Sequence, residues 1–346
     1  MKVRIKEVAR AAGVSSATVS KVLSGRAAYA VQAQTAQRVR QAALDLGYMP
    51  DVAARTLRTR QTGQLGVVLE AVGSSEPDSL LGGVTAGSAV RRTFDGAIMA
   101  GLNDAARGLQ VPALVVYPGG GRPAGSYLDG RVDGLLVGCD PLRGHGLLQD
   151  LSRAPLPVVA LWTENVPPGI GAVDIDHHGG AVQATEHLLG LGHTRIAFYG
   201  GGEASGIEHF QRRERGYRQA LRARGLSPLP AIHDGDSLVL AVRQGQVGAV
   251  FAETDLGAAA VFRALQRAGL RVPQDVSLVG FDDILGAEHI AGGLTTIYHP
   301  AAEMAAAGMQ MLMRRVHAGP GGAVPETVLL PTRLIVRRST RQRSPD

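Results

Sequence analysis

The chain has 346 residues, 45% of them hydrophobic, and a formal net charge of +6. This length exceeds the size at which one core usually stops growing, so we expect at least two domains. No run approaches the roughly 18 to 20 apolar residues that span a bilayer, and the charged start MKVRIKEVAR is unlike a secretion signal. We therefore expect a cytoplasmic protein without a membrane span. The one cysteine, Cys139, excludes an intrachain disulfide framework.

The positive charge is concentrated at one end of the chain. Residues 1–62 contain eleven Lys or Arg and three Asp or Glu, a net charge of +8, so the remainder carries −2. A small basic module on a near-neutral body is the pattern expected when one end neutralises phosphates. The alternative is a basic face that is merely solvated.

The first 48 residues favour a helix-turn-helix. A helix that begins at Ile5 is followed by Gly13, which lacks a Cβ and can adopt the left-handed conformation that ends helices. Ser15 is a good N-cap for a second helix over 16–23. A third helix carries apolar residues at helical spacing and stops at Gly47, and those residues are Val39, Ala42, Ala43 and Leu46.

The second helix has the two faces that a recognition helix needs. Val19, Val22 and Leu23 share one face and point inward. The opposite face carries only short or basic side chains, as insertion into the major groove requires, namely Ser16, Ala17, Ser20 and Lys21. A protein-binding bundle with the same periodicity is the alternative, and the basic excess weighs against it.

From Leu65 onward, apolar runs alternate with helical segments, which indicates parallel sheets covered by helices in an α/β fold. Seven such runs suit two sheets better than one. The runs are LGVVL, ALVVY, VDGLLVG, PVVALW, RIAFYG, GAVFAE and VSLVGF.

The segment IKEVARAAGVSSATVSKVLSG, followed by LGYMPDVAARTLRT, resembles the headpiece and hinge of the lactose-repressor (LacI/GalR) family of regulators. The resemblance continues through RVDGLLV, RRERGYRQAL, GLRVPQDVSLVGFDDI and PTRLIVRRST, and so covers nearly the whole chain. It implies a helix-turn-helix headpiece, a hinge helix and a two-lobed clamshell of parallel sheets like that of periplasmic binding proteins. The positions that match DNA contacts are Ser15, Ser16, Ala17, Thr18, Ser20, Lys21, Ser24, Ala54 and Leu57.

In that family the hinge folds on DNA, and a leucine from each subunit enters the minor groove; the matching residue is Leu57. The physics agrees, because residues 51–58 are far fewer than the roughly 12 at which an isolated helix becomes marginal. A plain linker is the alternative.

The resemblance also divides the chain into parts. It implies a DNA-binding domain over 1–49, a hinge and linker over 50–62, and a basic tail over 340–346. The first lobe is expected over 63–162 with 297–322, and the second lobe over 163–296 with 323–339.

Ligands of open α/β sheets bind beyond the carboxyl ends of strands, and Asp282 directly follows VSLVGF. The resemblance assigns effector binding to Asp282 and to Arg213 in RRERGY. A carboxylate with a guanidinium suits a polyol or a small anion, and a surface salt bridge is the alternative. Trp162 and Thr254 are the two other expected effector contacts, although the family carries an acid and an asparagine at these positions. The effector is therefore unknown, with a sugar as one candidate class and a cleft closed to small molecules as the alternative.

Other patterns give weaker signals. Asp174, Asp176, His177 and His178 resemble metal ligands, but neighbouring strand residues point to opposite faces, so we expect no metal site. The glycine runs lack the GK[ST] of a phosphate-binding loop, and no nucleophile elbow is present. We therefore expect neither a cofactor nor an enzyme.

Together these features predict a repressor that binds a pseudo-palindromic DNA operator under the control of a small molecule. We expect a homodimer, with a tetramer as the alternative, and a dimer face formed by residues 97–106 and 304–313. The rival hypotheses are a sugar-binding module whose N-terminal segment is not used on DNA, and a sugar-processing enzyme.

Overall fold

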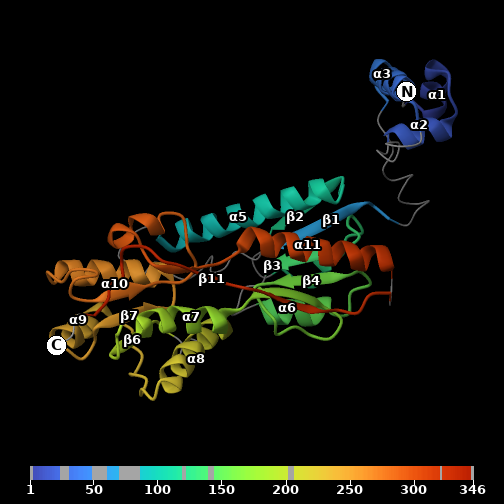
Figure 1. Cartoon of the computed structure of the whole chain (residues 1–346). Coiled ribbons are helices and arrows are strands. Elements are labelled where there is room, and N and C mark those ends of the chain that lie inside the picture. Colours follow the sequence, from blue (N-terminus) through green and yellow to red (C-terminus); the bar gives the residue numbers. More distant parts are fainter. Residues whose placement is uncertain are drawn as a thin grey trace. The chain divides into compact units, whose positions relative to one another are not determined.

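The computed structural model describes residues 3–23, 31–48, 61–69, 86–118, 122–138, 144–201, 206–319 and 322–343. The chain divides into two compact units, which we call the headpiece (Met1–Thr62) and the body (Gly63–Asp346). Both appear in Figure 1. Among the described residues, none of the helices combines the length and apolar character needed to span a membrane.

The headpiece contains three helices, α1 (Ile5–Ala12), α2 (Ser16–Leu23) and α3 (Ala33–Asp45). Gly13 has a φ of 64° and ends α1 in the left-handed conformation, as predicted. The Ser15 hydroxyl accepts the Thr18 N–H at 3.1 Å, which confirms the predicted N-cap. Val8, Val19 and Val39 form the centre of the core. Leu46, predicted to be inside, is 38% exposed because it follows the last turn of α3.

The first lobe of the body is built on a six-stranded parallel sheet with the order β10-β5-β4-β3-β1-β2. Helices α5 (Ala86–Gly108) and α11 (Ala301–Ala318) cover one face, and α6 (Gly144–Leu151) and the short η1 (Ala124–Tyr127) cover the other (Figure 1). The strands are β1 (Gln64–Leu69), β2 (Ala113–Pro118), β3 (Leu135–Gly138), β4 (Val158–Leu161), β5 (Gly171–Ile175) and β10 (Thr327–Leu330).

Helices α5 and α11 pack closely against each other. A Cβ on Gly101 of α5 would lie 2.2 Å from the carbonyl oxygen of Ala302 in α11, so only glycine allows this approach. The predicted dimer face over 97–106 and 304–313 lies on these helices, yet its large residues are buried within the chain, among them Ile98 and Met304. The apolar content of these segments therefore serves the core of the lobe.

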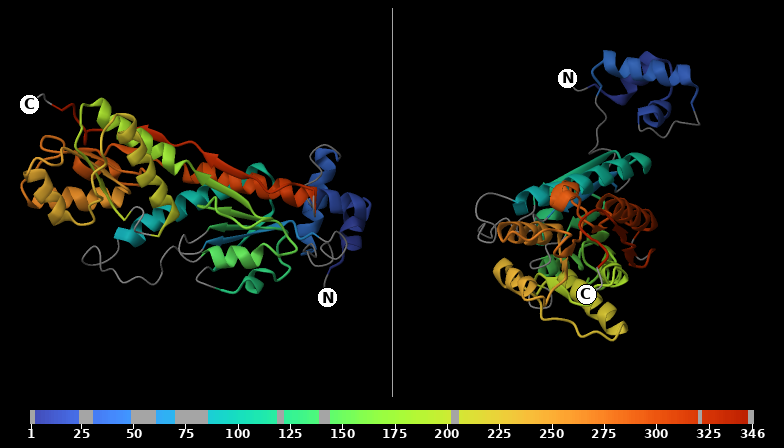
Figure 2. Two further views of the ribbon diagram at one scale, coloured as in Figure 1. Left: turned by 90° about the horizontal axis from the view of Figure 1, so that it is seen from below. Right: turned by 60° about the vertical axis from the view of Figure 1, so that its left-hand side comes forward.

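The second lobe contains the parallel strands β6 (Ile196–Tyr199), β7 (Ala249–Ala252) and β8 (Ser277–Val279). Helices α7 (His177–Gly190) and α8 (Glu208–Ala223) pack on one face, while α9 (Gly235–Arg243) and α10 (Asp255–Arg267) pack on the other. The turn η3 (Ala287–Gly292) follows β8, and β9 (Thr296–Tyr298) pairs antiparallel with β11 (Arg333–Ile335). In the left view of Figure 2, the yellow and orange helices of this lobe lie toward one end of the body and the green strands of the first lobe toward the other.

The strand pairings correct the predicted lobe boundaries. Strand β5 pairs with β4 and with β10, so both β5 and β10 belong to the first lobe. The chain therefore crosses between lobes after Ile175, rather than near 162–163, and crosses last between β10 and β11, rather than near 321–325. The predictions were wrong because these short strands need distant partners that local periodicity does not reveal.

The predicted basic tail is also corrected, since residues 340–343 pack along the second lobe. The Arg343 N–H donates to the Leu191 carbonyl at 2.8 Å, and the Thr340 hydroxyl lies 3.0 Å from His187 Nε2. Residues 344–346 lie outside the described residues.

Candidate functional site

The exposed face of α2 is the candidate DNA-binding surface. Ala17, Ser20 and Lys21 are exposed, while Val19 and Val22 on the opposite face are buried in the headpiece core. The helix contains no acidic residue, so nothing on it would repel phosphates. This is the arrangement that the sequence predicts for a helix that enters the major groove.

The other predicted DNA contacts divide into two groups. Ser16 is partly buried, and Ser15 and Thr18 are linked to each other, with 3.0 Å between their hydroxyl oxygens, at the start of α2. The Ser15 hydroxyl therefore serves first to cap the helix. Ser24, Ala54 and Leu57 lie outside the described residues, as does Cys139.

In the body, the structure brings together the two predicted effector residues Arg213 and Asp282. Arg213 lies on α8 and is only 2% exposed, and its Nη2 donates to Asp282 Oδ1 at 3.0 Å. Its Nη1 donates to the Glu253 carbonyl, and its guanidinium carbon lies 3.6 Å from the centroid of the Phe281 ring. The arginine is therefore held by charge, hydrogen bonds and an aromatic face together.

His177, the first residue of α7, extends this network toward the first lobe. Its Nδ1 lies 3.3 Å from Arg213 Nε, and a guanidinium can only donate, so Nδ1 accepts. Burial and the nearby Arg213 charge hold the His177 pKa well below its usual value, so the ring is neutral. The proton is therefore on Nε2, which lies 3.3 Å from Asp174 Oδ1. A continuous chain of contacts joins Asp174, His177, Arg213 and Asp282.

Burial controls the charges around this network. It raises the pKa of both Asp174 and Asp282 to about 6, although Arg213 opposes the shift. Burial also lowers the pKa of His299 to about 3 and that of His209 well below its usual value. Neutral imidazoles thus surround Arg213, which provides the fixed positive charge.

Asp255 holds the loop that carries Asp282. Its backbone N–H donates to the Phe281 carbonyl at 2.7 Å, and its carboxylate accepts the Ile284 N–H at 2.9 Å. Between these two anchors, Asp282 has a φ of 116°, in the region that favours glycine. Asp255 therefore fixes both sides of an unusual backbone conformation that positions Asp282.

The two other predicted effector residues have different hydrogen-bond and packing partners from this pair. The Thr254 hydroxyl accepts the Gly257 N–H at 3.0 Å and caps α10. Trp162 follows β4 in the first lobe, and its ring covers Gly138, where a Cβ would lie 2.7 Å from Cζ3. Among the described residues, neither one shares a hydrogen bond with Arg213 or Asp282.

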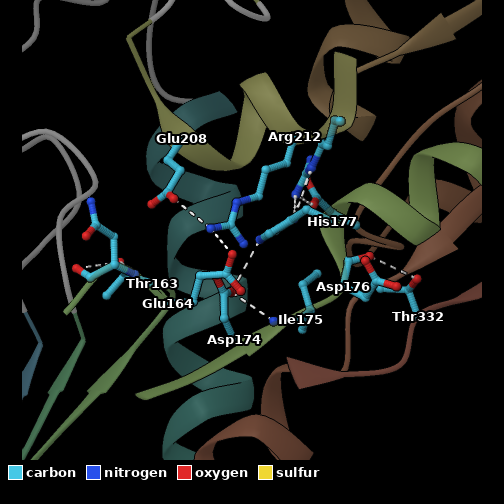
Figure 3. Close-up of polar contacts among 12 residues, drawn as sticks. Thr163, Glu164, Asp174, Ile175, Asp176, His177, Glu208, Arg212 and Thr332 are labelled. Carbon is cyan, nitrogen blue, oxygen red and sulfur yellow. Dashed lines mark hydrogen bonds and ion pairs between the residues drawn. The ribbon is translucent and has the colours of Figure 1, made fainter. Parts of the chain in front are cut away.

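Arg212 is a site residue that the sequence analysis missed. Its side chain reaches from α8 to Glu164, and its Nη2 lies 2.6 Å from Glu208 Oε1 (Figure 3). The signal was present, because RRERGY contains two consecutive arginines. Consecutive helix residues point in different directions, however, and only the fold shows where each one leads. Asp176, set aside as a metal ligand, caps α7 by accepting the Gly179 N–H at 2.7 Å.

A helix-turn-helix unit joined to a two-lobed α/β body with a buried polar network is typical of one class of protein. This class is the transcription regulator whose body has the fold of a ligand-binding domain. Two family models match the chain. Residues 4–51 match the bacterial regulatory proteins of the lacI family, and residues 185–340 match a periplasmic binding protein-like domain.

Whole-chain relatives agree with these matches. The transcriptional regulator CelR of Thermobifida fusca is 34% identical, with 97% of each chain covered. Catabolite control protein A of Priestia megaterium is 28% identical, with 99% of this chain and 100% of the relative covered. The chain belongs to the lacI family of bacterial regulatory proteins. It is a transcriptional regulator, which confirms the resemblance seen in the sequence, and the named relatives are regulators rather than enzymes.

Solved structures show the same architecture. The CelR–cellobiose complex superposes with a TM-score of 0.61 at 31% identity, covering 98% of this chain and all of that one. A lac repressor dimer bound to operator and an anti-inducer gives a TM-score of 0.73 at 24% identity, covering 99% of this chain and all of that one. The predicted fold class is therefore confirmed.

Proposed function

We propose that this regulator is a repressor that binds a pseudo-palindromic operator as a homodimer, and that a sugar bound between its lobes controls the operator affinity. A tetramer is the alternative assembly. Helix α2 of each headpiece reads the major groove, and Ala54 and Leu57 of the hinge contact the minor groove. The protein acts in the cytoplasm, where its DNA is found, and performs no catalytic reaction.

The observation that carries the DNA-binding proposal is the α2 surface. Ala17 and Ser20 are small enough to let the helix approach base edges, and Lys21 adds a positive charge that suits a phosphate or a guanine. Small side chains offer few base contacts, so the hinge and the deformability of DNA contribute to sequence preference.

The Arg213–Asp282 pair supports an uncharged effector. Asp282 already neutralises Arg213, so the pair offers hydrogen-bond acceptors and donors without a net positive charge that would attract an anion. Hydroxyl groups can use both kinds of partner. The structure named as a CelR–cellobiose complex shows that a relative at 31% identity holds a sugar. We assign further effector contacts to Trp162, which offers an aromatic face, and to Thr254.

The DNA-binding proposal is tested by selecting sequences from a random duplex library with the full chain and measuring affinity by fluorescence anisotropy. We expect enrichment of an inverted repeat, and a dimer mass in light scattering. Replacing Leu57→Ala should reduce affinity for the selected site more than for random DNA. A monomer mass, or no enriched sequence, would contradict the proposal and favour a ligand-binding module that does not use DNA.

The effector proposal is tested by calorimetry with cellobiose and ribose as probes. Binding of either sugar should be lost in Arg213→Ala and retained in Arg218→Ala, which removes a neighbouring arginine of the same helix. Equal binding by both variants would place the effector elsewhere.

A further inference from the structure

Arg212 joins two parts of the body that belong to different lobes. Its guanidinium contacts the carboxylates of Glu164 and of Glu208, both of which are labelled in Figure 3. Glu208 lies on α8, four residues before Arg212, and so belongs to the same lobe. Glu164 lies in the loop between β4 and β5, two neighbouring strands of the first-lobe sheet. Only the contact with Glu164 therefore links the lobes.

Each partner is fixed to its own lobe. The loop that carries Glu164 is held to the sheet, because the Trp162 N–H donates to the Val173 carbonyl at 3.2 Å. Helix α8 is held to the second-lobe sheet, because the Tyr217 hydroxyl donates to the Ile196 carbonyl of β6 at 2.8 Å. A change in the distance between the lobes would therefore separate Arg212 from Glu164 instead of moving both together.

Other ion pairs of the body lie inside one lobe. Arg218 pairs with Glu214 on α8, and Arg337 pairs with Asp283 inside the second lobe, so neither pair is stretched when the lobes move apart. Asp174 and the neutral His177 also meet across the lobes, but they stand on either side of the first chain crossing, three positions apart in the chain, and so stay close when the lobes move.

The environment makes the link stronger than a typical surface ion pair. The side chains of Arg212 and Glu164 are only 14% and 28% exposed, so water screens their attraction incompletely. Glu208 belongs to the same lobe as Arg212, and its Oε1 lies 2.6 Å from Arg212 Nη2. This contact keeps the guanidinium in place, so less side-chain entropy is lost when Arg212 binds Glu164.

We infer that Arg212 and Glu164 form an inter-lobe latch that holds the body in the lobe arrangement seen here. The regulatory meaning of the latch rests on the proposed function, since lobe movement would alter operator affinity. The latch itself is independent of DNA and effector, and can be tested without either.

The test measures the distance between lobes in the full chain by pulsed electron spin resonance. Spin labels are attached at Asp150→Cys on α6 and Leu240→Cys on α9, both exposed, in a Cys139→Ser background. Excess unlabelled chain keeps distances within one subunit separate from those between subunits. Glu164→Gln and Glu208→Gln then form a matched pair, because each removes one carboxylate from the same guanidinium.

With Glu164→Gln we expect loss of the narrow wild-type distance peak and a broader distribution that extends to longer distances. Glu208→Gln should broaden the distribution much less, because the contact between Arg212 and Glu164 remains. Arg212→Ala should give the same distance distribution as Glu164→Gln. Combining the two substitutions should broaden the distribution no further, because both remove the same interaction. A wild-type distribution for Glu164→Gln, or the same broadening in Glu208→Gln, would overturn the latch. Failure of operator selection would contradict the proposed function and leave this result unaffected.

Discussion

Asp174 and His177 are three residues apart in the chain and 3.3 Å apart in space, yet they belong to different lobes. Asp174 lies in β5 of the first-lobe sheet, and His177 begins α7 of the second lobe. Their contact therefore spans the point where the chain first crosses between lobes. Because His177 also contacts Arg213, the crossing is connected directly to the candidate effector site.

Replacing Asp174→Asn should change how stability depends on pH. Burial raises the folded-state pKa of Asp174 from 3.8 to about 6, so its charged form is disfavoured in the folded protein. Its contribution to stability is therefore present below pH 3.8 and is lost as the pH rises through 6. The amide cannot ionise, so the variant should gain about 2 kcal/mol over the wild type between pH 4.5 and 7. Urea unfolding at these two pH values measures the difference, and a constant difference would contradict the assigned pKa.

Replacing Arg213→Ala should destabilise the body, because Asp282 would be left buried without its partner. The expected loss is about 3–5 kcal/mol at pH 7, the usual result of breaking a buried ion pair. The loss should shrink as the pH falls toward 6, because without Arg213 the pKa of Asp282 rises further and its carboxyl group takes up a proton. Arg271→Ala is the control, since that arginine is exposed, and should cost at most about 1 kcal/mol. Equal losses by both variants would show that Arg213 does not stabilise Asp282.

Replacing Lys21→Ala should weaken DNA binding without unfolding the headpiece. If Lys21 meets a phosphate, the slope of log affinity against log salt concentration should fall by about 1. If it reads a guanine, one base position should lose its preference. Arg40→Ala on α3 removes a charge away from the predicted recognition helix and should leave base preference unchanged. Anisotropy titrations over a range of salt concentrations measure both effects. Unchanged DNA binding by Lys21→Ala would contradict the placement of α2 in the major groove.

Two glycines of α5 should respond in opposite ways to alanine. Gly101→Ala should cost about 1–3 kcal/mol, because its Cβ would meet the backbone of Ala302 and force α11 to move. Gly96→Ala meets nothing within 4 Å and should stabilise the helix by up to about 1 kcal/mol. Thermal unfolding of both variants measures the contrast. Tolerance of Gly101→Ala would contradict the close packing of α5 and α11.

The features that could be predicted from the sequence are those encoded locally. Gly13 and Ser15 mark the turn of the headpiece because the backbone at those positions needs their specific chemistry. The seven predicted apolar runs all contain strands, since buried parallel strands form continuous apolar segments. Strand β10 escaped prediction because it is an edge strand with an alternating pattern of partly exposed residues.

The site was only partly predictable for a related reason. Arg213 and Asp282 could be named from their positions in motifs, but their direct pairing depends on how α8 meets the end of β8. The network through His177 and the link from Arg212 to Glu164 also require contacts between distant segments. The cap formed by Thr254 could have been found, because a threonine directly before a helix is a common N-cap.

We propose above all that a ligand at the Arg213–Asp282 pair controls operator affinity. The direct measurement is the affinity of the full chain for its selected operator, with and without a saturating sugar that calorimetry has shown to bind. We expect the affinity to change between about 5-fold and 150-fold, the usual range of coupling between two sites, and Arg213→Ala to abolish the change. An operator affinity that stays the same when the sugar is bound would contradict the claim.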